Sequence, residues 1–422
     1  MPGTASVQIT TLDNGLRVAS DSMSGVETVS LGVWAAVGTR HEPAAVNGVS
    51  HLLEHMAFKG TERRSARDIA VEVEAVGGQI NAYTTRERTA YYAKMLADDL
   101  PLAIDILADI LQHSTYDAEE LARERQVILQ EIGQAEDTPD DIVFDHFQAV
   151  AYPGQALGRP VLGAAEIVAR MSREEVAGYQ HRNYGPEALV LAAAGRVEHD
   201  RLVALAKRHF RNLPDGAPPP PEPARFVGGV RCTERDLEQL HLALGFQGVG
   251  YLDPDYYTQS VFSTLYGGGM SSRLFQEVRE KRGLVYSVYS FASPYADGGL
   301  FAVYAGTGKE EAKELLPVVA DELRRLPATL ETAEVDRAKA QLRADILMAR
   351  ESTSARAEQL AHQLLTYGRA VSPAELVRRV EAVDEARVVA FAERLRRGAV
   401  AFTALGPVGG LPSDGALGRL FH

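Results

Sequence analysis

Residues 212–223 read NLPDGAPPPPEP, with four consecutive prolines at 218–221, and this stretch divides the chain into two halves. Consecutive prolines favour extended polyproline II and cannot continue a helix or a central strand. We therefore predict a linker at 212–225 that joins an N-terminal domain, 1–211, to a C-terminal domain, 226–422. A length of 422 residues is also typical of two or three domains.

The two halves read as diverged copies of one pattern. LGVWAAVGTRHEP at 31–43 and LALGFQGVGYLDP at 242–254 each combine an apolar strand, a turn of small residues and a proline-containing connection. Segments rich in Tyr, Thr and Val, typical of hairpins, follow in each half, and helical stretches come after them. Strands and helices are mixed without strict alternation, which favours an α+β fold over a doubly wound parallel sheet. We predict two homologous α/β sandwich domains, each a mostly antiparallel sheet with helices packed on it.

Composition and charge exclude several classes of protein. The chain has 57 acidic and 44 basic residues, a net charge of −13, which argues against nucleic acid as a partner because phosphate binding needs a positive surface. Cys232 is the single cysteine, so a disulfide framework and a cysteine-based zinc cluster are excluded. The longest apolar run, 188–194, is far shorter than the ~20 residues of a membrane span. The first residues lack the patterns of a secretory signal or a transit peptide, so we expect a cytoplasmic protein.

The strongest chemical signal is the pentapeptide HLLEH at 51–55. Positions i and i+4 of a helix share a face, so His51 and His55 can bind one ion. Glu54 lies on that face too and can hold a water molecule beside the ion without being a ligand. This is the inverted zinc-peptidase motif, H-x-x-E-H. Hydrolytic zinc needs three protein ligands and an open position, so a third ligand must come from elsewhere in the chain.

Glu131, in ERQVILQEIG at 124–133, is the best candidate for the third ligand. Glu124 and Glu131 are seven residues apart with Ile128 between them, so they lie on one stripe of a helix. Two carboxylates on a partly apolar face are costly to bury unless a cation lies opposite. A zinc ion bound by Glu131, with Glu124 orienting a histidine, accounts for both. An ordinary solvated helix face is the alternative reading of this pair.

HLLEHMAFKGT at 51–61, together with ERQVILQEI at 124–132, resembles the zinc metallopeptidases of the pitrilysin, insulysin and mitochondrial processing peptidase family. The likeness is strongest to the processing peptidase β subunit and its bacterial relatives. It covers nearly the whole chain, and continues through GGQINAYTTRERTAYY at 77–92 and GGGMSSRLFQEVREKRGLVYSVYSF at 267–291. The resemblance implies a metalloenzyme fold of the LuxS and processing-peptidase type and zinc as the cofactor. Its ligands would be His51, His55 and Glu131, with Glu54 as the general base and Glu124 supporting the site.

The resemblance also implies that the peptide substrate lies along the strand at 77–84, GGQINAYT, with Asn81, Ala82 and Tyr83 in contact with it. An exposed strand edge offers free N–H and C=O groups to any extended peptide, so recognition would depend on the backbone. The Asn81 amide would fix the scissile peptide near the metal. Without the neighbouring zinc motif, an ordinary hairpin that binds no ligand would be the preferred reading.

Five further residues are implied by the family pattern. Arg282 and Tyr289, seven residues apart, would reach the zinc site, where a guanidinium can clamp a carbonyl and a phenol can stabilise an oxyanion. Phe58 would line the pocket for the residue after the cut. Asp141 and Asp145 would recognise an arginine before the cut, and the alternative for these two is a solvated start of a helix.

We therefore expect a zinc-dependent endopeptidase that cleaves peptides or unfolded, extended protein segments, with a preference for basic residues near the cut. The alternative is a non-catalytic partner or core-type subunit of the same family. The expected assembly is a homodimer with shared sites, or a heterodimer with a related inactive subunit. Neither nucleic acid nor a membrane span is expected.

Overall fold

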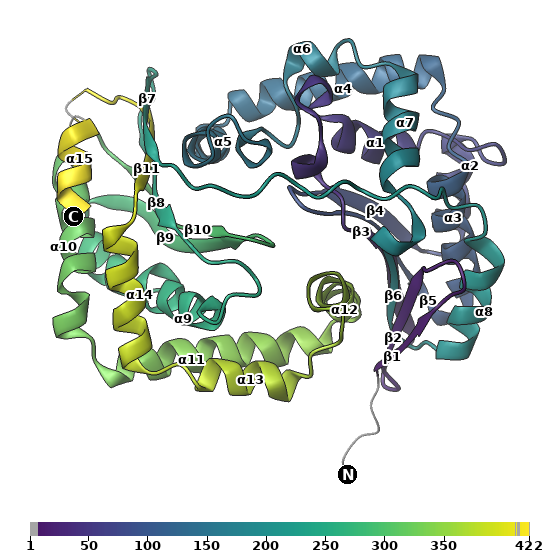
Figure 1. Cartoon of the computed structure of the whole chain (residues 1–422). Coiled ribbons are helices and arrows are strands. Elements are labelled where there is room, and N and C mark those ends of the chain that lie inside the picture. The colour runs from purple at the N-terminus through teal and green to yellow at the C-terminus, as the bar shows by residue number, and fades with distance from the viewer. Residues whose placement is uncertain (1–6, 410, 412–413, 422) are drawn as a thin grey trace. The chain divides into compact units, whose positions relative to one another are not determined.

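A computed structural model describes residues 7–409, 411 and 414–421 of the chain (Figure 1). The residues group into two compact units. Unit 1 contains Met1–Gly133, Arg159–Glu222 and Met348–Ala370, and unit 2 contains Gln134–Gly158, Pro223–Leu347 and Val371–His422. Each unit is one sheet with helices on both faces, which is the α+β arrangement that the sequence predicts.

Among the described residues of unit 1, six strands form one sheet in the order β1-β2-β6-β3-β5-β4. Their pairing is antiparallel except between β2 and β6, which are parallel. The last strand in this order, β4, has a neighbour on one side only, so its other edge is free of strand partners in this unit. The strands are β1 (Val7–Thr11), β2 (Arg17–Ser22), β3 (Thr28–Ala35), β4 (Gln79–Thr84), β5 (Thr89–Leu96) and β6 (Leu189–Gly195).

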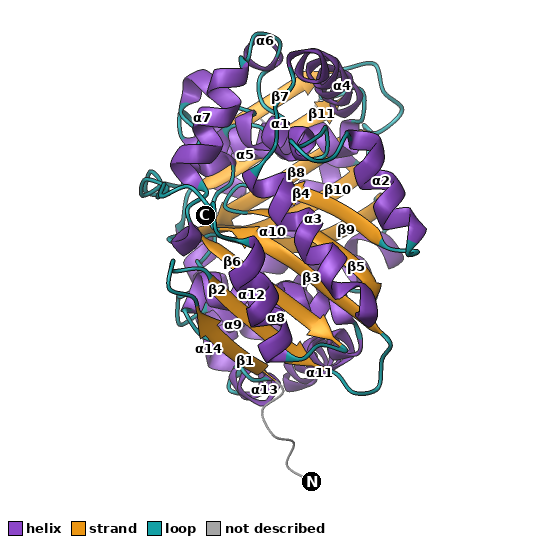
Figure 2. Cartoon of the chain, turned by 90° about the vertical axis from the view of Figure 1, so that its right-hand side faces the viewer, coloured by secondary structure: helices purple, strands orange, loops and turns teal. Residues whose placement is uncertain are grey.

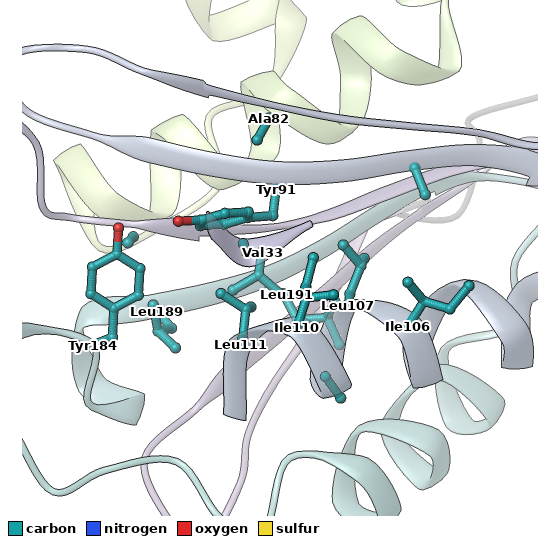
Figure 3. Packing of buried hydrophobic residues seen from close by; sticks show 14 of the residues in the cluster. Val33, Ala82, Tyr91, Ile106, Leu107, Ile110, Leu111, Tyr184, Leu189 and Leu191 are labelled. Carbon is teal, nitrogen blue, oxygen red and sulfur yellow. The ribbon is translucent and has the colours of Figure 1, made fainter. Parts of the chain in front are cut away.

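One face of this sheet carries the main core of unit 1. Leu191 of β6 and Val33 of β3 pack with Leu107 and Ile110 of α3, and Tyr91 of β5 lies in the same layer (Figure 3). Figure 2 shows α3 and α8 lying over the strands, and α1 and α7 also belong to this part of the unit. The helices are α1 (Val49–Ala57), α2 (Ala66–Ala75), α3 (Leu100–Gln112), α4 (Ala118–Glu136), α6 (Ala165–Val168), α7 (Arg173–Asn183) and α8 (His199–His209).

The other face of the sheet is covered by α12 (Thr353–Tyr367), which comes from the C-terminal half of the sequence. Successive side chains of a strand point to opposite faces, and β6 is buried along its whole length. Its residues 190, 192 and 194 therefore face α12, against Leu360 and Leu364. Arg356 of α12 also donates two hydrogen bonds, each 2.6 Å long, to the buried carboxylate of Asp21 on β2.

Unit 2 repeats this plan with a sheet in the order β7-β11-β8-β10-β9. Here too one pair, β7 and β11, is parallel and the other pairs are antiparallel. The strands are β7 (Gly229–Glu234), β8 (Leu240–Gln247), β9 (Val285–Pro294), β10 (Gly299–Thr307) and β11 (Val400–Gly406). The matching order of five strands is the structural form of the internal repeat that the sequence predicts.

The helices of unit 2 also divide between the two faces of its sheet. One face carries α9 (Tyr256–Gly267), α10 (Ala312–Thr329), α11 (Thr332–Met348), α13 (Pro373–Glu381), α14 (Glu385–Arg397) and α15 (Asp414–Phe421). The other face is covered by α5 (Pro139–Ala151), which comes from the N-terminal half of the sequence and packs on β11 and β8.

The units therefore differ from the predicted domains 1–211 and 226–422 by two exchanged segments. The helix α5 belongs to unit 2 and α12 to unit 1, because each sheet has an apolar face that its own half of the chain leaves uncovered. Residues 212–228 contain no helix or strand, and the chain passes from unit 1 to unit 2 between Glu222 and Pro223, inside the predicted linker.

None of the described helices is both long and apolar enough to cross a membrane.

The ion pair between Asp21 and Arg356 should make a large contribution to the stability of unit 1. Asp21 is only 5% exposed, so Arg356→Ala leaves a buried carboxylate without its bidentate partner. We expect the free energy of unfolding to fall by about 3–5 kcal/mol, measured by urea denaturation. Arg397→Ala is the matched control, since the pair of Arg397 with Glu393 is solvent-exposed and should contribute less than about 1 kcal/mol. Equal losses in the two variants would contradict the assignment.

Candidate active site

The helix α1 presents two different faces. Its apolar residues lie in the core of unit 1, and the residues with this role are Val49, Leu52, Leu53, Met56 and Ala57. His51, Glu54 and His55 are half-buried and lie on the opposite face, as the i, i+3, i+4 spacing predicts. The apolar stripe thus fixes the rotation of the helix, and that rotation brings both imidazoles and the carboxylate to one side.

The start of α1 is held by a buried carboxylate that the sequence reasoning missed. Glu42, 3% exposed, accepts hydrogen bonds from the backbone N–H groups of Gly48 and Ser50, each at 2.8 Å. The Asn47 side-chain amide donates a third at 2.9 Å. Burial raises the pKa of Glu42, and these hydrogen bonds oppose the rise. Gly48 has φ 98°, and a Cβ there would lie 2.9 Å from Gly163 Cα, so only glycine fits at this bend.

Three potential ligand atoms converge between α1 and α4. His51 Nε2 and His55 Nε2 each lie 3.7 Å from Glu131 Oε2, and the three ligand atoms lie within 4.8 Å of one another. A tetrahedral zinc ion with bonds of about 2.1 Å separates its ligand atoms by roughly 3.4 Å. The cluster therefore fits one zinc ion with small side-chain adjustments. Two imidazole nitrogens and one carboxylate oxygen also form a donor set that is typical of hydrolytic zinc.

Glu124 determines how His55 faces this cluster. Its Oε2 lies 2.9 Å from His55 Nδ1, and its Oε1 lies 2.7 Å from Lys59 Nζ. An ionised carboxylate at Nδ1 favours the tautomer with the proton on that nitrogen, which leaves the Nε2 lone pair directed toward Glu131. Glu124 is thus only 5% exposed and is paired with His55 and Lys59. It therefore does not belong to a solvated face of α4.

His51 is held less tightly than His55. Its Nδ1 is buried and has no hydrogen-bond partner among the described residues. Burial, followed by the nearby His55, lowers the pKa of His51 to about 4, so the imidazole is neutral at pH 7. A neutral imidazole is the form that binds a metal.

Glu54 lies beside the cluster without joining it. Its Oε2 accepts a hydrogen bond of 2.6 Å from the hydroxyl of Thr84, the last residue of β4. Burial is the largest influence on Glu54 and raises its pKa, whereas the Thr84 hydrogen bond lowers it. Sequence reasoning missed Thr84. Its position two residues after Ala82, on the same face of the strand, was the available signal.

The strand β4 has the place predicted for it, at the edge of the unit 1 sheet. Asn81 is exposed, and its side-chain oxygen accepts a hydrogen bond of 2.8 Å from the backbone N–H of Ala82. Tyr83 lies toward the α12 face, because its hydroxyl donates to Glu358 at 2.8 Å and accepts from the Trp34 indole at 3.2 Å. The side chain of Tyr83 is therefore anchored on the face of the sheet opposite to Thr84 and α1.

Phe58 caps the C-terminal end of α1, where the helix ends. It is half-buried against the unit 1 core, and its ring centroid lies 6.5 Å from that of Tyr91. It is thus carried by the same helix as His51 and His55, three residues beyond the second histidine.

The other four predicted residues lie in unit 2, whereas the metal cluster lies in unit 1. Arg282 follows the π-helix Phe275–Glu280 and donates to Glu277, at 2.6 Å to the carboxylate and 2.8 Å to the carbonyl. Asp141 is exposed and Asp145 half-buried on α5. These residues and the metal cluster therefore belong to different units.

Tyr289 belongs to β9, the edge strand of the unit 2 sheet. It is 41% exposed, and its ring centroid lies 5.1 Å from that of Tyr304 on β10. Burial, and then the negative charge of Asp140, raises the pKa of Tyr289, so its phenol stays protonated at neutral pH and can donate a hydrogen bond. A side chain of a strand core would be fully covered, so the partial exposure leaves Tyr289 accessible to a ligand.

Comparisons with known proteins agree with the resemblance. The family model described as insulinase (peptidase family M16) matches residues 17–165, and the one described as peptidase M16 inactive domain matches 170–342. An uncharacterized zinc protease of Rickettsia bellii is 37% identical over 400 residues, covering 94% of this chain and 97% of the relative. A probable mitochondrial-processing peptidase subunit beta of Arabidopsis thaliana is 38% identical over 421 residues, covering 96% of this chain and 79% of the relative.

Solved structures show the same fold. A protease from Helicobacter pylori superimposes with a TM-score of 0.88 at 23% identity, covering 95% of this chain and 99% of that one. This likeness confirms the predicted two-domain α+β fold. M16 peptidases use zinc and the Rickettsia bellii relative is named a zinc protease, so the predicted cofactor is confirmed. The chain belongs to the M16 family of zinc metallopeptidases, the pitrilysin family.

Proposed function

We propose that this chain is a zinc-dependent endopeptidase that cleaves peptides and unfolded, extended protein segments. One observation carries the proposal: His51, His55 and Glu131 converge on one point while the carboxylate of Glu54 stays outside the ligand set. A structural zinc site uses all four positions for protein ligands, whereas three ligands and a nearby base are typical of a hydrolytic site.

The proposed mechanism assigns a separate task to each residue. His51, His55 and Glu131 hold zinc, which when bound polarises the scissile carbonyl and makes water more acidic. Glu124 keeps His55 in the tautomer that faces the ion. Glu54 takes a proton from the attacking water and passes it to the leaving amine nitrogen, so the C–N bond breaks and a carboxylate and an amine are released.

The free edge of β4 supports the proposed substrate class. Thr85 N–H donates to Arg88 O across the hairpin turn, and Thr84 is paired with Thr89. Because hydrogen-bonded and non-hydrogen-bonded pairs alternate along an antiparallel ladder, the backbone groups of residues 80, 82 and 84 are directed away from β5. A peptide can add to this edge through its main chain, and its carbonyl would replace the Asn81 oxygen at Ala82 N–H. Main-chain pairing requires an extended peptide, which excludes folded substrates.

Unit 2 supplies the rest of the proposed site by family resemblance. Arg282 would clamp a substrate carbonyl, and Tyr289 would donate to the oxyanion of the tetrahedral intermediate. We propose that the active form is a dimer, with itself or with a related inactive subunit, in which one chain supplies these two residues to the metal centre of the other. Phe58 would contact the residue after the cut, and Asp141 and Asp145 would favour a basic residue before it.

A second candidate is a non-catalytic subunit of the same family. The description of the second family model as an inactive domain favours it. Against it stands the full set of metal-centre residues in unit 1, since three ligands with a separate carboxylate beside them are typical of a hydrolytic site and not of a structural one. This candidate predicts that the wild-type chain cleaves no peptide at any ratio of zinc to protein.

Glu54→Gln tests the proposed base. The change keeps the shape of the side chain but removes the proton acceptor, so we expect cleavage of a quenched fluorescent peptide to fall at least about 100-fold. Zinc content should remain about one ion per chain, measured by atomic emission. Glu119→Gln, an exposed carboxylate at the start of α4, is the control and should cleave normally. A wild-type rate for Glu54→Gln would exclude the mechanism.

The zinc ligands are tested by metal content. His51→Ala and Glu131→Ala each remove one of three ligands, so both variants should lose zinc on dialysis against a chelator that leaves the wild type loaded. Glu124→Gln should retain zinc but bind it about 10- to 100-fold more weakly, because the hydrogen bond that orients His55 is altered. Tight zinc binding by all three variants would place the metal elsewhere.

Complementation tests the shared dimer. Glu54→Gln and Arg282→Ala homodimers should each be nearly inactive. After subunit exchange, about half of the dimers would be mixed and each would hold one intact site, so roughly a quarter of wild-type activity should return. If exchange is demonstrated by labelled subunits and no activity returns, the sites are not shared. An active monomer at all concentrations would exclude the dimer.

A further inference from the structure

Thr84 connects the edge strand to the carboxylate of Glu54. Its hydroxyl is 2.6 Å from Glu54 Oε2 and 3.5 Å from the Ser50 carbonyl of α1. A hydroxyl has one proton to donate, and the shorter contact with the carboxylate identifies the acceptor. Among the described residues, Thr84 supplies the hydrogen bond that the Glu54 carboxylate receives.

We propose that Thr84 is a positioning residue for Glu54, so that the strand which receives the peptide also sets the direction of the base. This inference rests on the proposed function and deepens it. A glutamate side chain has three rotatable bonds, so its carboxylate keeps one direction only when a fixed partner holds it. With Oε2 held by Thr84, Oε1 is the oxygen left to receive a proton.

Thr84 is suited to this task because its own position is fixed. It is β-branched, so its χ1 angle is restricted. The turn after it is tied down by hydrogen bonds from Thr39 N–H to Thr85 O at 3.1 Å and from Arg40 N–H to Arg86 O at 2.7 Å. Thr89, its partner in the hairpin, is fully buried and donates to Val37 O at 2.9 Å.

The same connecting segment also fixes the helix that carries Glu54. Residues 38–48 lie between β3 and α1, and Glu42 within this segment caps the start of α1. One short piece of backbone therefore holds both the hairpin that places Thr84 and the helix that places Glu54. This piece therefore supports both the donor and the acceptor of the hydrogen bond between Thr84 and Glu54.

The geometry separates the effects on catalysis from those on binding. The backbone groups of Thr84 are directed to the free edge of β4, while its hydroxyl is directed to Glu54. Removing the hydroxyl leaves the main-chain edge intact, so peptide binding should be preserved. A misdirected base lowers the rate of the chemical step, so the loss should appear in kcat.

Thr84→Val is the test variant, because it keeps the size and the β-branch and removes the hydroxyl. We expect kcat for a quenched fluorescent peptide to fall about 10- to 100-fold, with KM within about twofold of wild type and one zinc per chain. Thr84→Ser, which retains the hydroxyl, should recover most of the lost kcat. Thr28→Val is the matched control and should cleave normally. Thr28 is a half-buried strand threonine of β3 whose side chain has no hydrogen bond to any described residue.

The outcomes separate this inference from the proposed function. If the wild type cleaves no peptide, either alone or mixed with a related inactive subunit, the proposed function fails. If the wild type cleaves and Glu54→Gln does not, but Thr84→Val keeps wild-type kcat, the inference alone is overturned. A change confined to KM, loss of zinc, or a Thr84→Ser variant as slow as Thr84→Val would also overturn it. If Thr84→Val shows no cooperative unfolding transition, Thr84→Ala is measured against Thr84→Ser in the same way.

Discussion

Three carboxylates surround the imidazoles of His51 and His55 in a partly buried part of unit 1, and they belong to Glu54, Glu124 and Glu131. This concentration of acidic groups constrains the rest of the site. Lys59 offsets one charge through Glu124. The imidazole of His51 is kept neutral by burial and offsets none. A divalent cation between Glu131 and the histidines resolves the imbalance, because it attracts Glu131 directly and also reduces the repulsion felt by Glu54. Under the proposed mechanism, a bound zinc ion would therefore affect the position of Glu54 as well as the substrate.

The backbone at the start of α1 is held in place, and this keeps the charged groups of the site at fixed separations. The buried Glu42 carboxylate pairs with the first N–H groups of α1, where a helix has donors without partners and a partial positive charge. Its cost of burial is offset by three hydrogen bonds and by the helix dipole. A site that holds several acidic groups at fixed separations needs such supports, since the carboxylates of Glu54 and Glu131 repel one another when the metal is absent.

Sequence reasoning found the parts of the site that depend on helical periodicity. The spacing of His51, Glu54 and His55 and the seven-residue step from Glu124 to Glu131 each place residues on one face of a single helix, and the structure has both helices. Thr84 and Glu42, in contrast, make their hydrogen bonds to a different element of the fold, α1. The two-residue period of a strand places Thr84 on the same face as Ala82, but it does not show that α1 lies over that face, and no period marks Glu42.

The sequence predicts the internal repeat of the fold, but it does not predict that α5 and α12 are exchanged between the two units. Strand composition and the proline run indicate two similar halves, and the two sheets do share one strand order. Nothing local in the sequence of α5 or α12 indicates which sheet it covers, because an amphipathic helix reads the same whichever apolar surface it meets. The domain boundaries depended on that choice, which is made by tertiary packing.

The exchanged helices also bear on how such a chain could have arisen. The helices α5 and α12 occupy equivalent places in the two repeats, each covering the sheet that contains the other repeat's strands. A half-length ancestor with this fold would have had one sheet face that it could cover only with a helix of a second copy. Two such copies would form a reciprocally swapped pair, and joining them by the proline segment would turn a concentration-dependent association into an intramolecular one. During synthesis of the present chain, the apolar face of the first sheet that α12 covers stays uncovered until residues 353–367 have been made.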